Sequence, residues 1–130
     1  MGGIGALQIG LRHPDRFASI ACFSGPILDR EQSDHFINRS WLRLFAPLKR
    51  IFGTMEDRAF FDAHNPYAIV EARGAALDQR LYLAAGTRDR PFVLETARQF
   101  HEFLEARGVP HEWEVYDGGH AWTCWEPLLQ

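Results

Sequence analysis

The chain has 130 residues, of which 46% are hydrophobic and 24% charged, and this balance is typical of one packed domain and excludes an intrinsically disordered chain. The 14 Lys and Arg residues against 17 Asp and Glu residues give a net charge of −3, which argues against a surface dedicated to nucleic acid or to an anionic membrane. No apolar run reaches the ~20 residues that span a bilayer, and two cysteines with no signal-peptide pattern at the start predict a cytoplasmic protein.

The first predicted element is a helix over residues 2–12, whose apolar side chains recur at helical spacing. Pro14 then biases His13 away from helical geometry and ends the helix. Because glycine disfavours helix, glycines in the first turn predict a backbone that packs closely against a neighbour. These glycines are Gly2, Gly3 and Gly5.

Three short apolar runs bounded by turn residues predict buried strands, at residues 17–24, 80–85 and 111–116. Between the second and third run, residues 92–107 carry an apolar stripe at helical spacing, made by Val93, Ala97, Phe100 and Leu104. A strand, a helix and a strand at this spacing form a βαβ unit. The sequence therefore predicts a single α/β domain over residues 1–130, with a three-stranded parallel sheet and flanking helices.

Residues 26–79 are an aromatic-rich excursion between the first two strands. Short helices are predicted around residues 31–52, 56–63 and 66–72, with one helix ending and the next beginning at Asn65-Pro66. Such an excursion either forms a lid or pocket wall over the sheet or simply covers it as a helical layer.

Polar residues follow the second and third predicted strands. Asp89 comes after Gly86, and His120 stands on a Gly-Gly loop; in open α/β sheets, catalytic groups gather at this carboxyl edge. An Asp that orients a His is half of a Ser-His-Asp triad, although Asp89 could also cap the next helix. Ser24 and Cys124 are alternative nucleophiles. In the structural interpretation, Ser24 forms the turn that leaves the first strand and Cys124 is a packing residue. The histidine spacing matches no metal-binding pattern, so we expect no metal.

Several phrases together resemble the esterase branch of the α/β-hydrolases, which includes esterase D (S-formylglutathione hydrolase), feruloyl esterases, enterochelin esterases and mycolyltransferases. In family order they are MGGIGAL at 1–7, HPDRFA at 13–18, SG at 24–25, FG at 52–53 with Asp57 and Asn65-Pro66, GTRD at 86–89 and GGHAW at 118–122. The resemblance implies a partial α/β-hydrolase fold with Asp89 as the triad acid and His120 as the base. It also implies that Ser24 is structural.

The same resemblance places the serine nucleophile just before Met1 and so outside these residues. Met1 would then supply one oxyanion-hole N–H, compromised here by its free amino terminus. Trp122, Trp41 and Phe61 are the candidate pocket residues, the expected ligand is an ester substrate, and no cofactor is expected.

Two functional hypotheses follow. The chain is the C-terminal portion of a serine carboxylic-ester hydrolase that is inactive alone, or it is a non-catalytic module that self-associates or binds a ligand. Because the first strand would have an unpaired edge, we expect a homo-oligomer or a missing N-terminal segment or partner chain.

Overall fold

The computed structural model describes residues 2–39, 50, 53–54 and 56–129. The chain begins with helix α1 (Gly2–Arg12) and strand β1 (Ser19–Phe23), followed by helices α2 (Arg30–Arg39), α4 (Arg58–His64) and α5 (Pro66–Arg73) and the 3₁₀ turn η2 (Gly74–Ala76). It continues with β2 (Arg80–Gly86), α6 (Pro91–Glu105), β3 (Glu112–Tyr116), α7 (Trp122–Trp125) and η3 (Glu126–Leu129). No helix in the described parts is long and apolar enough to cross a membrane.

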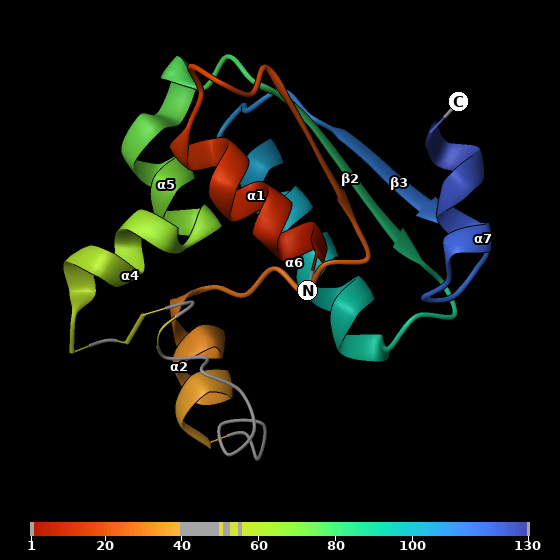
Figure 1. Cartoon of the computed structure of the whole chain (residues 1–130), viewed down its shortest axis with the longest axis horizontal. Helices are drawn as coiled ribbons and strands as arrows, with labels where there is room; N and C mark the ends of the chain where they lie inside the picture. The colour runs from red at the N-terminus through yellow and green to blue at the C-terminus, as the bar shows by residue number, and fades with distance from the viewer. Residues whose placement is uncertain (1, 40–49, 51–52, 55, 130) are drawn as a thin grey trace.

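The three strands form one parallel sheet in the order β1-β2-β3, as the sequence predicts. The register pairs Cys22 with Leu83 and Leu83 with Trp113. Because side chains alternate along a strand, these residues share one face of the sheet. Because the strands are parallel and paired in this register, their carboxyl ends lie at the same edge of the sheet. The arrowheads of β2 and β3 point towards α7 (Figure 1).

The hydrophobic core lies on one face of the sheet, under α1, α5 and α6 (Figure 1). The predicted stripe of α6 is buried in full, with Phe100 and Leu104 both 0% exposed. Leu7 of α1 and Val70 of α5 meet the same core and are also 0% exposed. The opposite face carries exposed Ala21 and half-buried Tyr82. Among the described helices, α7 lies at the carboxyl ends of the strands (Figure 1).

The glycine prediction for α1 holds at one position. A Cβ on Gly3 would lie 2.9 Å from both Cys22 Sγ and Phe23 O, so only glycine lets α1 approach the end of β1 this closely. For Gly2 and Gly5 the prediction is wrong, because a Cβ there would meet nothing within 4 Å.

The described α-helices of the excursion are α2, α4 and α5, and η2 follows them. Residues 40–49 and 51–52 of the predicted 31–52 helix lie outside the described residues. Asn65 caps the end of α4 and the start of α5, accepting from the backbone N–H of Tyr67, and Pro66 opens α5. This confirms the predicted junction between two helices.

Candidate functional site

The loops after β2 and β3 are held together by backbone hydrogen bonds that continue the strand pairing. Thr87 N–H donates to Tyr116 O at 3.0 Å, and Arg88 N–H donates to Gly118 O at 2.8 Å. Outside these bonds, Arg88 forms an exposed ion pair with Asp117 at 3.1 Å. The sheet register therefore sets the spacing between the two loops.

A glycine at the end of β2 allows this close approach of the two loops. A Cβ on Gly86 would overlap the carbonyl oxygen of Gly118 and lie 2.8 Å from a ring carbon of Tyr116. A Cβ on Gly118 would lie 2.7 Å from Cys124 Sγ. Because the Cβ on Gly86 would meet the backbone of the other loop, the two loops could not come this close with alanine at position 86. At Gly118 the close atoms belong to side chains, those of Cys124 and Tyr116.

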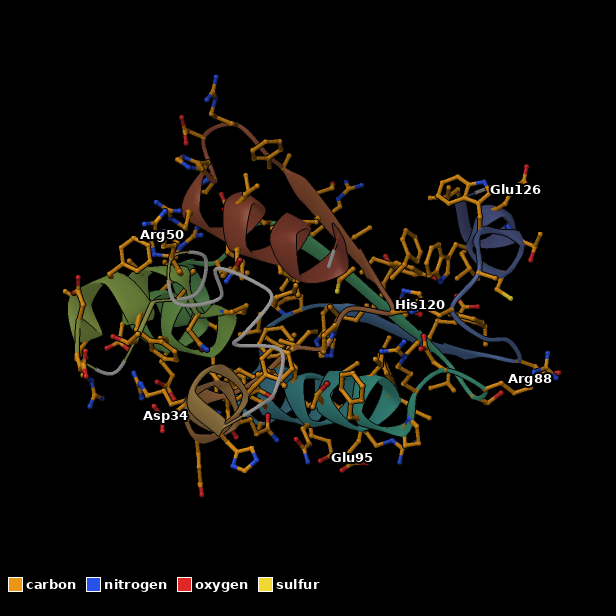
Figure 2. All side chains as sticks on the ribbon, turned by 60° about the horizontal axis from the view of Figure 1, so that its bottom comes forward. Asp34, Arg50, Arg88, Glu95, His120 and Glu126 are labelled. Carbon is orange, nitrogen blue, oxygen red and sulfur yellow. The ribbon has the colours of Figure 1, made fainter. Side chains whose placement is uncertain are left out.

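Asp89 and His120 meet where the loops come together. His120 Nδ1 lies 3.2 Å from Asp89 Oδ2 and 3.3 Å from Oδ1. The Asp89 side chain is 0% exposed, whereas that of His120 is 50% exposed. Figure 2 shows His120 near the ends of β2 and β3, with Arg88 farther out on the turn after β2.

The hydrogen bonds of Asp89 orient the imidazole. Oδ1 also accepts from the Arg90 N–H at 2.7 Å, which holds the carboxylate in place. Asp89 does not cap α6, because the N-cap residue is Arg90 and makes no side-chain cap bond, so that alternative is wrong. A carboxylate acceptor requires the proton on Nδ1, which leaves the Nε2 lone pair of the half-exposed ring able to accept a proton.

A second cluster of hydrogen-bonded polar side chains, which contacts the His120 ring, was not predicted from the sequence. Ser24 Oγ and Tyr116 Oη are 2.7 Å apart, and the Trp125 indole N–H donates to Tyr116 Oη at 2.8 Å and to Ser24 Oγ at 3.3 Å. The Trp125 ring meets the His120 ring edge to face, with centroids 5.0 Å apart. Only the aromatic character of the last residues could have signalled Trp125, and nothing in the sequence signals the contact between Ser24 and Tyr116.

The other predicted site residues are distributed as follows. Trp122 is 64% exposed and is the first residue of α7. Phe61 of α4 is 1% exposed and packed in the interior. Met1 and Trp41 lie outside the described residues.

Ser24 occupies a position that suits a structural residue. It is 1% exposed, its N–H donates to Ala84 O, and its φ of +49° marks the turn that leaves β1. Cys22, two residues earlier on β1, is 2% exposed, and this burial raises the pKa of its thiol to about 12.

A groove of about 460 Å³ lies between α2 and the first turn of α6. One of its lining residues is Phe92, which follows Asp89 by three residues in the chain and is 46% exposed. Leu28, His35, Phe36 and Thr96 also line it. Residues of α2 and of the segment before it therefore line one side of this groove, and residues of α6 line the other.

The family model described as "Putative esterase" matches residues 1–130. The chain belongs to this esterase family. It is 33% identical over 134 residues to Esterase Rv1288 of Mycobacterium tuberculosis, in a match that covers 92% of this chain and 29% of that protein. It is 26% identical to the acetyl esterase of Caldicellulosiruptor saccharolyticus, covering 99% of this chain and 48% of the relative.

A solved ferulic acid esterase shares the fold, with a TM-score of 0.66 and 27% identity over 99% of this chain and 44% of the solved one. The chain therefore spans less than half the length of these relatives, and its architecture is a partial α/β-hydrolase fold. The resemblance predicted from the motifs is confirmed at the level of family and fold.

Proposed function

We propose that this chain supplies the acid–base half of a serine carboxylic-ester hydrolase, with Asp89 and His120 as triad acid and base. The observation that carries the proposal is the geometry of this pair: a fully buried carboxylate 3.2 Å from Nδ1 of an imidazole whose ring is half exposed. In such a pair, Nε2 accepts the proton of the attacking serine hydroxyl and returns it to the leaving alcohol. Asp89 holds the tautomer and stabilises the imidazolium that forms.

We further propose that the nucleophile comes from outside residues 1–130. Among the described residues, no serine hydroxyl forms a hydrogen bond with His120, and Ser24 Oγ is engaged by Tyr116 and Trp125. The chain alone would then show no esterase turnover, because a triad without its nucleophile loses on the order of 10⁶ in kcat.

The outer edge of β1 supports a related proposal about partners. In the described sheet β1 is an edge strand, and exposed strand edges pair readily with other chains. We propose that this edge pairs with a strand from a longer polypeptide, a partner chain or a second copy. We also propose a cytoplasmic location, which is consistent with two free cysteines, Cys22 and Cys124.

A chimera tests the catalytic proposal. Residues 1–130 replace the aligned 48% of the Caldicellulosiruptor acetyl esterase. Under the proposal, the remainder of that protein supplies the nucleophile. The measurement is hydrolysis of p-nitrophenyl acetate, together with labelling by a fluorophosphonate probe read by intact mass. We expect activity that falls by about 10⁴ in Asp89→Asn and by at least as much in His120→Ala.

The 130-residue chain serves as the matched control and is expected to take up no probe. An adduct on this chain that disappears in His120→Ala would show an internal nucleophile and contradict the second proposal. A folded, active chimera whose turnover is unchanged by His120→Ala would contradict the first proposal. That result would favour the alternative of a non-catalytic, ligand-binding module, for which the groove lined by Phe36 and Phe92 is the candidate site.

A further inference from the structure

We infer that Trp125 is a positioning residue for His120, and that buried hydroxyls of Ser24 and Tyr116 fix its indole ring for this task. The inference rests on the proposed function, because it concerns how the base of that catalytic pair is held. It adds a second support to the imidazole, on a side that Asp89 does not contact.

The first step is the orientation of the indole. An indole N–H can only donate, so its direction is set by the oxygens that accept from it. Tyr116 Oη and Ser24 Oγ lie 2.8 Å and 3.3 Å from Trp125 Nε1 and 2.7 Å from each other, which closes a triangle of polar atoms. The acceptors come from the ends of β3 and β1, so the position of the indole is fixed relative to the carboxyl edge of the sheet.

The second step is the presence of serine at position 24. Its φ of +49° lies in the left-handed region, where a side chain is disfavoured and glycine is free of strain. Serine nevertheless stands there, 1% exposed, with its hydroxyl shared between Tyr116 and Trp125. The hydroxyl provides what glycine would lack, a fixed acceptor for the indole.

The third step is the contact with His120. Asp89 holds Nδ1 through one carboxylate, and a hydrogen bond at a single ring atom leaves the imidazole free to swing about that atom. The Trp125 ring stands edge to face against the imidazole, at an interplanar angle of 84°. This contact removes the swing and keeps Nε2 directed at one place, and such orientation is what proton transfer in a triad requires.

The test measures His120 itself and needs no turnover. In the ¹⁵N-labelled 130-residue protein, NMR reports the ring tautomer of His120 and the rate at which its Nδ1 proton exchanges with water. Trp125→Phe keeps an aromatic ring but loses the N–H, and Tyr116→Phe loses the central hydroxyl. Because each removes about one hydrogen bond, we expect exchange about five- to ten-fold faster in both variants, together with a mixture of tautomers.

Trp113→Phe is the matched control. It is the same substitution on β3, at a ring that stacks on His101 instead of His120, and it is expected to leave the His120 signals unchanged. Unchanged exchange and tautomer in Trp125→Phe would overturn the inference, and so would an equal change in Trp113→Phe. A change in Tyr116→Phe alone would also overturn it, because Trp125 would then not transmit the constraint.

The chimera then separates this inference from the proposed function. We expect Trp125→Phe to lower kcat about five- to ten-fold with KM unchanged, since the indole acts on the base. If the chimera is inactive although the NMR result holds, the proposed function fails and the positioning of His120 stands. If the chimera is active and Trp125→Phe raises KM but leaves kcat unchanged, the positioning inference fails alone.

Discussion

Gly86→Ala should disrupt both the stability of the fold and the Asp89–His120 pair through a single steric contact. The new methyl group would overlap the carbonyl oxygen of Gly118 and lie 2.8 Å from the ring of Tyr116. Because a carbon and an oxygen normally approach to about 3.3 Å, the loop that carries His120 must retreat by about 1 Å. Gly86 is not among the described glycines with positive φ, so the cost is entirely steric.

The expected loss of stability follows from two contributions. Overpacking of a tight contact costs about 1–3 kcal/mol, and the lost hydrogen bond between Arg88 N–H and Gly118 O costs about 1 kcal/mol more. The free energy of unfolding should therefore fall by about 2–4 kcal/mol, as measured by urea denaturation. The same displacement takes His120 Nδ1 out of hydrogen-bond range of Asp89, and a misplacement of about 1 Å can lower turnover of the chimera about 100-fold.

Gly5→Ala is the matched control for this prediction. A Cβ at Gly5 would meet nothing within 4 Å, and the residue lies inside α1, where alanine favours the helix. This variant should gain about 0.5–1 kcal/mol in the free energy of unfolding. The reasoning is refuted if Gly86→Ala unfolds at the same urea concentration as the unsubstituted protein while the NMR signals of His120 stay in place.

Three further outcomes are expected from the core and the titratable groups. Phe100→Ala, at a ring that is 0% exposed, should lower the free energy of unfolding by about 3–5 kcal/mol in the same urea assay. Burial raises the pKa of Tyr67, and burial with the Glu114 carboxylate raises the pKa of Tyr82. Both phenols therefore stay protonated in the folded protein above pH ~10, where they ionise in the unfolded chain. The free energy of unfolding should fall as pH rises above ~10, and it should fall less in Tyr67→Phe and Tyr82→Phe. Because burial raises the pKa of the Cys22 thiol to about 12, iodoacetamide should alkylate Cys124 and spare Cys22 until urea unfolds the protein, as read by intact mass.

The elements with strong local signals could be predicted from the sequence. The α6 stripe follows helical spacing, and the helix ends at Glu105, shortly before Gly108 with its positive φ of 64°, so its type and buried face depend on neighbouring residues. The predicted start of β1 at Phe17 was two residues early. Phe17 is 42% exposed, and its N–H donates to His13 O in the turn after α1, which delays the strand to Ser19.

The meeting of Asp89 and His120 could also be anticipated, and for a physical reason. Parallel strands end at one edge of a sheet, so residues that follow neighbouring strands come together whatever lies between them in the chain. What the sequence could not supply was the distance, which depends on the register of Gly86 with Tyr116 and on the absence of a side chain at Gly86, which lets the loops touch.

The Ser24–Tyr116–Trp125 cluster could not be read from the sequence, because its members share neither a motif nor a period. Ser24 is 92 residues from Tyr116 and 101 residues from Trp125, and only the parallel sheet and the turn into α7 bring them together. A motif names the groups that react, since the chemistry restricts those residue types. The residues that hold such groups in place are restricted by geometry and not by residue type, so they can be identified only once the fold is known. Here the three residues of the cluster support His120, whose side chain is 50% exposed and whose ring contacts Trp125.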